Sequence, residues 1–165
     1  MKTILYWTGV GSRETPKELK KNFMKISHYL EQLGFILRTG DADGADDFFR
    51  TGVKSFKNKI IYTAKDATPE SMEIASQIHP AWHNCSDYAK KLHGRNCFQV
   101  LGEDFNSKSE FLLCWTKNGK VTGGTATAIN LAKQNNIPVF NFGSDYKKVI
   151  EEFKTYLKNN YLKNP

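Results

Sequence analysis

Long apolar runs are missing from this 165-residue sequence. No stretch reaches the roughly 20 residues that a membrane-spanning helix needs, and Gly9 interrupts the apolar opening (residues 4–7) before it reaches the length of a signal-peptide core. Cysteine is also scarce, because Cys85, Cys97 and Cys114 are odd in number and show no paired spacing. The sequence therefore predicts a protein of the reducing cytoplasm, without disulfides and without a membrane partner.

Linkers, internal repeats and low-complexity segments are absent as well. Hydrophobic residues make up 39% of the chain, and a chain of this length buries enough apolar surface for a core of its own. We expect one globular domain that spans residues 1–165.

The charge is uneven, with 24 lysines and arginines against 17 acidic residues and a net charge of +7. Such an excess attracts anions, nucleic acid among them. The lysines do not form one block, however. They lie in two helix-like segments with acidic residues between them, as Lys17, Lys20, Lys21, Lys25, Lys147, Lys148, Lys154 and Lys158. This distribution favours a solvated basic surface and makes nucleic acid the less favoured partner.

Short apolar runs alternate with segments of helical periodicity along the chain. The pattern predicts strands at residues 4–8, 35–39, 59–63, 110–116 and 137–142, and helices at 15–33, 45–56, 125–134 and 146–157. A further helix is expected to begin at residues 68–70. Such alternation predicts an α/β fold, a Rossmann-like domain of three layers with a mainly parallel sheet.

Two segments carry more detailed predictions. Thr15 is expected to cap the first helix, with Glu18 completing a capping box and Gly34 ending the helix. Between residues 78 and 102 we expect short helices that are broken at Pro80 and at Gly94.

Three glycine-rich turns each follow a predicted strand: the first loop (residues 9–13), the second loop (40–46) and the third loop (122–127). Glycine lets backbone N–H groups approach a ligand closely, and a helix N-terminus adds partial positive charge. In a parallel sheet these turns share one edge, where ligands bind. The predicted binding residues in these loops are Gly9, Gly11, Ser12, Arg13, Gly40, Gly44, Gly123, Gly124, Thr125 and Thr127.

The second loop also contains carboxylates, among them Asp41 and Asp46, which would repel a phosphate placed close to them. Some of these aspartates can cap a helix, and others can bind sugar hydroxyls, a base edge or Mg²⁺. Phosphate-binding loops beside such groups point to a nucleotide. Trp115 ends a strand at the same edge and is a further candidate for contact with a base.

A second possible metal site involves His79, His83 and Cys85. Pro80 disrupts the helix that would bring the two histidines together, and no further ligand lies nearby in the sequence. The sequence therefore favours a protein with no bound metal or other cofactor, and Mg²⁺ at the aspartates is the alternative.

Together, the three loops resemble the SLOG superfamily, which includes DNA-processing protein A and the Lonely Guy enzymes, over residues 6–142. Residues 39–46 look like the Ser-Gly-Gly-Ala-x-Gly-Ile-Asp motif of the DNA-processing protein. Residues 93–102 are similar to a stretch of stand-alone, phage-type members, which makes Arg95 and Asn96 candidate site residues. The resemblance implies a nucleotide-related ligand, a homo-oligomer and, through the phage-type members, an anti-defence role in the host cytoplasm.

One difference from the family bears on the choice between ligand binding and ligand hydrolysis. Lonely Guy hydrolases carry Pro-Gly-Gly-x-Gly-Thr-x-x-Glu with a catalytic glutamate, and in this register the glutamate position holds Asn130. An amide cannot act as a general acid or base. The sequence therefore favours binding, by sensing or sequestering, of a nucleotide-derived small molecule such as a cyclic ADP-ribose-like or cyclic-nucleotide signal, without enzyme activity. The alternatives are a nucleotide N-glycosidic hydrolase that uses an aspartate of the second loop, and a single-strand DNA binder.

Overall fold

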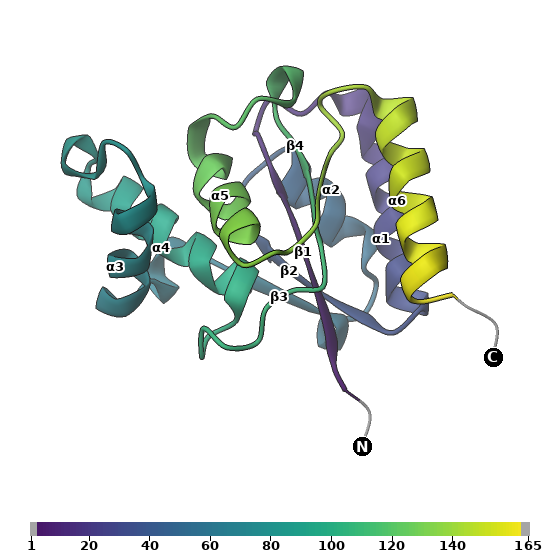
Figure 1. The fold of residues 1–165 in the computed structure, drawn as a ribbon, viewed down its shortest axis with the longest axis horizontal. Helices are drawn as coiled ribbons and strands as arrows, with labels where there is room; N and C mark the ends of the chain where they lie inside the picture. The colour runs from purple at the N-terminus through teal and green to yellow at the C-terminus, as the bar shows by residue number, and fades with distance from the viewer. Residues whose placement is uncertain (1–2, 163–165) are drawn as a thin grey trace.

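The computed structural model describes residues 3–162 and contains a five-stranded sheet (Figure 1). The strands are β1 (Leu5–Gly11), β2 (Phe35–Gly40), β3 (Lys59–Tyr62), β4 (Leu112–Trp115) and β5 (Val139–Asn141). They lie in the order β3-β2-β1-β4-β5, and every neighbouring pair is parallel. This confirms the α/β fold predicted from the alternation of strands and helices.

The helices are α1 (Lys20–Gln32), α2 (Ala45–Gly52), α3 (Pro69–Ile78), α4 (Asp87–Leu101), α5 (Ala126–Gln134) and α6 (Tyr146–Asn160). In Figure 1, α1, α2 and α6 cover one face of the sheet, α4 and α5 cover the other, and α3 packs on α4. The three predicted layers are therefore present. No helix in residues 3–162 combines the length and the apolar character needed to cross a bilayer.

The two faces of the sheet have different cores. Aromatic rings dominate the side of α1, α2 and α6, where Phe23 stacks on Phe49 at 4.6 Å between ring centroids and Trp7 lies between Phe49 and Phe111. Smaller side chains fill the side of α4 and α5, with Cys97 and Cys114 fully buried among them. The apolar contacts of both faces hold the strand ends in fixed positions.

The start of the first helix differs from the prediction. The Thr15 hydroxyl donates to the Ser12 carbonyl at 2.5 Å instead of capping a helix. A 3₁₀ turn occupies Lys17–Leu19, and α1 begins only at Lys20. The predicted capping box is wrong because the first loop turns back on itself and takes the Thr15 side chain. Gly34 does follow the helix end, with φ +93°.

Helix α4 runs without a break through Gly94, so the predicted break there is wrong. Gly94 lies where α4 approaches α3, and a Cβ at this position would lie 2.7 Å from Cγ of Met72 and 3.0 Å from Oγ of Ser71. The glycine is therefore explained by helix packing and not by a turn. The other predicted break is present, since α3 ends at Ile78, two residues before Pro80.

Candidate functional site

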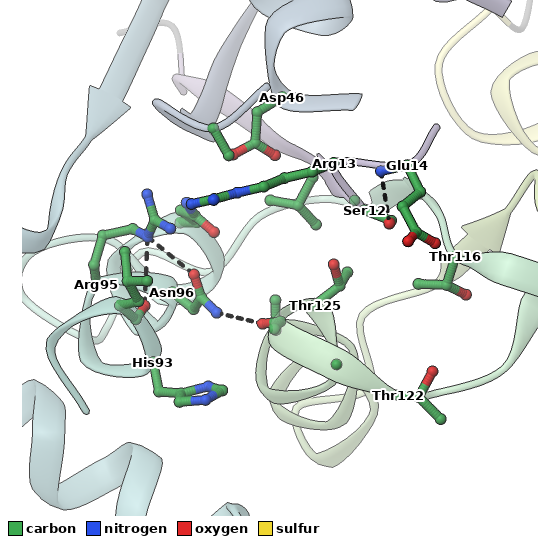
Figure 2. A pocket seen from close by; sticks show the side chains of 18 of the residues that line it. Ser12, Arg13, Glu14, Asp46, His93, Arg95, Asn96, Thr116, Thr122 and Thr125 are labelled. Atoms are coloured by element: carbon green, nitrogen blue, oxygen red, sulfur yellow. Dashed lines mark hydrogen bonds between the residues drawn. The ribbon is translucent and has the colours of Figure 1, made fainter. Parts of the chain in front are cut away.

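The strand order reverses between β1 and β4, and a pocket of about 580 Å³ lies where these two strands end (Figure 2). Its walls come from the first loop, the end of β4, one face of α4 and the third loop. In open α/β sheets, ligands bind outside the carboxyl ends of the strands at this reversal. We refer to it as the switch-point pocket.

The first loop is fixed between the two strands. The backbone N–H of Ser12 donates to the Trp115 carbonyl at 2.9 Å, and Oγ of Ser12 accepts from the N–H of Glu14 at 3.0 Å. The exposed side chain of Arg13 lines the pocket and extends toward Arg95 (Figure 2). The fixed backbone thus leaves the Arg13 guanidinium free to reach a ligand.

Glycines of the first two loops serve close packing. A Cβ on Gly44, where φ is +78°, would lie 2.3 Å from the carbonyl oxygen of Ser12, and one on Gly11 would lie 2.6 Å from Cβ of Ala45. Gly9 faces the aromatic core, and Gly40 lies against the side chains of Asp46 and Arg95. These contacts hold the first and second loops together, and of the four glycines only Gly11 lines the pocket.

The third loop is open instead. A Cβ on Gly123 or Gly124 would meet no atom within 4 Å, and both glycines line the pocket. The 3₁₀ turn Gly123–Thr125 leads into α5, and neither Thr122 nor Thr125 caps these N-termini with its side chain. The backbone N–H groups at the start of this turn are therefore accessible to an anion.

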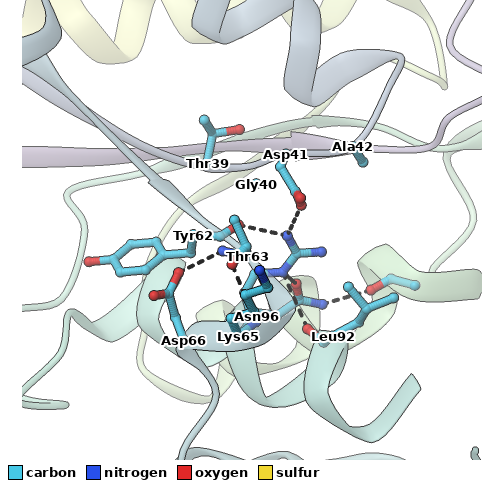
Figure 3. Close-up of polar contacts among 12 residues, drawn as sticks. Thr39, Gly40, Asp41, Ala42, Tyr62, Thr63, Lys65, Asp66, Leu92 and Asn96 are labelled. Carbon is cyan, nitrogen blue, oxygen red and sulfur yellow. Dashed lines mark hydrogen bonds and ion pairs between the residues drawn. The ribbon is translucent and has the colours of Figure 1, made fainter. Parts of the chain in front are cut away.

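Asn96, labelled in Figure 3, and its neighbour Arg95 on α4 connect the loops. Arg95 is 6% exposed, and its Nη1 donates to the Tyr62 carbonyl at 2.9 Å and to Oδ1 of Asp41 at 3.1 Å. Its Nε donates to Oδ1 of Asn96, whose Nδ2 donates to the Gly124 carbonyl at 2.9 Å. This chain of bonds ties the second loop and β3 to the third loop, so Asn96 holds Gly124 in place.

Asp46, the second residue of α2, is 4% exposed and lines the pocket. Burial raises the pKa of this carboxyl to about 7, although the charge of Arg95 and the backbone N–H groups of Ala42 and Gly11 favour its ionised form. A carboxyl in this state can donate or accept a hydrogen bond at neutral pH. It therefore repels a phosphate less than an ordinary aspartate would.

Gln99 lies one turn of α4 beyond Asn96 and is 1% exposed. It lines the pocket, and no group among residues 3–162 donates a hydrogen bond to its Oε1. A buried amide oxygen without a partner costs free energy. Its Oε1 is closed off from solvent, so a bound molecule could reach this oxygen only after the Gln99 side chain rotates.

The pocket brings together nine of the fifteen predicted site residues. They are Gly11, Ser12, Arg13, Asp46, Arg95, Asn96, Gly123, Gly124 and Thr125. Gly9, Gly40, Asp41, Gly44, Trp115 and Thr127 lie outside its lining. Trp115 packs against the aromatic core, and Thr127 is 1% exposed and bonded to His93. Ligand contact by any of the fifteen stays a prediction.

Sequence reasoning missed His93 and Gln99, which share one face of α4 with Asn96. Spacings of three residues place these side chains on the same side of a helix. The expected break at Gly94 obscured that face. An unbroken helical reading of residues 87–101 would have found it.

Asn130, at the position of the Lonely Guy glutamate, lies in α5 outside the pocket lining. The aspartates of the second loop do not form a group of three side chains that could hold a metal ion. Among residues 3–162 the one such group of histidines, cysteines and acids is His79, Cys85 and His93.

The fold and the site together define a Rossmann-like α/β protein with a polar pocket at its switch point. No family model and no curated protein matches this chain. One solved structure of similar fold is DNA processing protein A from Helicobacter pylori, described for its unique single-stranded DNA binding mode. Its TM-score is 0.57 at 14% sequence identity, over 84% of this chain. The match spans 65% of that chain, just under two thirds of its length. At this identity the likeness supports the fold.

Proposed function

We propose that this protein binds a nucleotide-derived small molecule in the switch-point pocket and senses or sequesters it. A cyclic ADP-ribose-like or cyclic-nucleotide signal is an example of such a ligand. The observation that carries the proposal is that the open N–H groups at Gly123 and Gly124 share one pocket of about 580 Å³ with Arg13 and Arg95.

The phosphate end of the ligand would lie between the first and third loops. Arg13 makes no ion pair within residues 3–162, and its side chain extends toward a second guanidinium on Arg95. Because Arg95 is paired with Asp41, Arg13 is the arginine of the two that is free to bind a phosphate, which a guanidinium does with two parallel hydrogen bonds. Lys117 adds a third cation to the lining.

The other end of the ligand would be uncharged and polar. Gln99 adds a buried amide to the α4 wall, which a rotation of its side chain would turn toward the ligand, and Asp46 is a carboxyl that is partly protonated at neutral pH. Apolar side chains of Val10 and Leu92 lie in the same lining. This combination suits the hydroxyls of a ribose or the edge of a base, and the volume is within the range of small-molecule sites.

Single-strand DNA binding is the second candidate. Besides the fold likeness, a shallow hollow on α1 favours it. The α1 lysine patch, which we define as Lys17, Lys20, Lys21, Lys25 and Lys54, surrounds this hollow. Clustered lysines attract a phosphate backbone without sequence preference. An N-glycosidic hydrolase would need a carboxyl group of the pocket, either Asp46 of the second loop or Glu14, because Asn130 lies outside the pocket.

The deciding experiment is native mass spectrometry of protein purified from its natural host, followed by binding measurements. We expect a retained small molecule of nucleotide-like mass. Arg13→Ala should release it, whereas the double variant Lys20→Glu/Lys21→Glu should retain it. The converse pattern, with oligonucleotide affinity lost in the lysine variant and no retained small molecule, would support the DNA-binding candidate.

A further inference from the structure

We propose that His79, Cys85 and His93 form a binding site for a zinc-class transition metal beside the switch-point pocket. The proposal does not depend on the function proposed above. His79 follows α3, Cys85 precedes α4, and His93 projects from α4 itself. One ligand atom from each residue lies within 4.8 Å of the other two.

The spacing of the three groups suits a single ion. Donor atoms about 2.0–2.3 Å from a tetrahedral metal lie roughly 3.3–3.8 Å from one another. Sγ of Cys85 lies 4.0 Å from Nδ1 and 3.7 Å from Nε2 of His79, and the rings of His79 and His93 are 4.6 Å apart between centroids. The cluster therefore needs a contraction of about an ångström to enclose an ion.

His93 is held in a suitable orientation. Its Nδ1 lies 2.8 Å from Oγ1 of Thr127, which is itself buried. When Nδ1–H donates to that hydroxyl, the lone pair of Nε2 is free for a metal, and such outer partners are usual for ligating histidines. Burial and the neighbouring His79 lower the pKa of His93, which favours the neutral ring that metals require.

His79 must change one hydrogen bond. Its Nδ1 accepts from the backbone N–H of Ala81 at 3.0 Å, so the neutral ring carries its proton on Nε2. A metal can replace that N–H at Nδ1, which is 4.0 Å from Sγ of Cys85. The second route to metal binding is a rotation of the His79 ring about its Cβ–Cγ bond, which also breaks the hydrogen bond from Ala81. Either route exchanges one hydrogen bond for a coordination bond.

The donor set selects the kind of metal. One thiolate and two imidazoles favour Zn²⁺ and similar ions over Mg²⁺ or Ca²⁺, which prefer oxygen. Three protein ligands leave a coordination position for water or for a group of a bound molecule. Because His93 also lines the switch-point pocket, the metal would lie one side chain away from that pocket.

The test uses the full chain without a polyhistidine tag, kept reduced and titrated with Co²⁺ and Zn²⁺. We expect one metal ion per chain and a thiolate-to-cobalt charge-transfer band. Cys85→Ser should abolish the band, and His79→Gln should weaken zinc binding by roughly 100-fold or more. The matched control is His83→Gln, since His83 is exposed and lies in the same segment. It should bind metal like the wild type.

The variant Thr127→Val tests the hydrogen bond between Thr127 and His93. It should weaken zinc binding by about 10–100-fold. Circular dichroism of each variant verifies that the fold is retained. Folded wild-type protein without the cobalt band would overturn the proposal. Equal zinc affinity in Cys85→Ser and His83→Gln would overturn it as well, and would leave the cluster as a set of hydrogen bonds between His79, Ala81 and Cys85.

Discussion

At the scale of single residues, Arg13 and Arg95 carry the same charge but are held very differently. The Arg95 guanidinium is buried and bonded to Asp41 and to the Tyr62 carbonyl. Arg13 is exposed and free of ion pairs within residues 3–162. Arg95 thus belongs to the framework of the pocket, and Arg13 can move toward a ligand without breaking a contact of the fold.

We therefore expect Arg13→Ala to weaken ligand binding by about 1.5–3 kcal/mol, the scale of a hydrogen bond to a charged group. The free energy of unfolding should change by less than about 0.5 kcal/mol, since the side chain is exposed. Calorimetry with the retained ligand gives the first value and urea denaturation the second. Lys147→Ala, an exposed charge on α6, is the control. Unchanged affinity in Arg13→Ala would remove this residue from the site.

Substitution of Gln99 should affect the free energy of unfolding and the ligand affinity in different ways. Gln99→Met removes the buried amide oxygen that has no partner and keeps a side chain of similar length. The free energy of unfolding should stay the same or rise by up to about 1 kcal/mol, and ligand affinity should fall about tenfold. Gln77→Met on exposed α3 surface controls for the substitution itself. A loss of stability without a loss of affinity would assign Gln99 to the fold alone.

The raised pKa of Asp46 predicts that the free energy of unfolding depends on pH. Burial raises its pKa to about 7 in the folded protein, against about 4 in an unfolded chain. Between these pH values the folded state holds a proton that the unfolded state has released, so this group's contribution to the free energy of unfolding falls as pH rises from about 4 to about 7. Asp46→Asn should therefore gain stability relative to wild type as pH rises. Urea denaturation at several pH values tests this, and parallel profiles would contradict it.

At the scale of loops and helices, glycines of similar loops have different roles. Gly44 is required by its φ of +78° and by contact with Ser12, whereas Gly124 faces open space. Gly124→Ala should leave the free energy of unfolding within about 0.5 kcal/mol of wild type and weaken ligand binding, because its Cβ enters the pocket. Gly44→Ala should destabilise the fold by about 2 kcal/mol or more. Denaturation and calorimetry of the pair test this, and unchanged binding in Gly124→Ala would place the ligand elsewhere.

Element order was predictable because strand and helix periodicities are local properties of the sequence. The roles of Gly94 and Thr15 were not, because each depends on a tertiary contact: Gly94 with Met72, and Thr15 with the Ser12 carbonyl. The same reason applies to His93. Its position beside His79 follows from the packing of α4 on α3, which the sequence does not reveal.

At the scale of the whole molecule, the parallel topology places three distant loops at one edge of the sheet. Arg13 in the first loop and Gly124 in the third are more than one hundred residues apart, yet both line the switch-point pocket. The strand order β3-β2-β1-β4-β5 is responsible, because it puts the ends of β1 and β4 next to each other. A ligand held at this point would contact both halves of the fold.

We expect the pocket to bind its ligand without cleaving it. Glycosidic cleavage needs a group that protonates the leaving base or activates water, commonly worth about 10²–10⁴ in rate. Asn130 lacks this chemistry and lies outside the pocket, and Asp46, which lines the pocket, is already bonded to the backbone N–H groups of Ala42 and Gly11. We therefore expect the ligand to be returned intact after heat denaturation of the complex, as chromatography of the supernatant would show. Release of free base or ribose phosphate over several turnovers would instead establish a hydrolase. Its loss in Asp46→Asn would then assign the catalytic carboxylate.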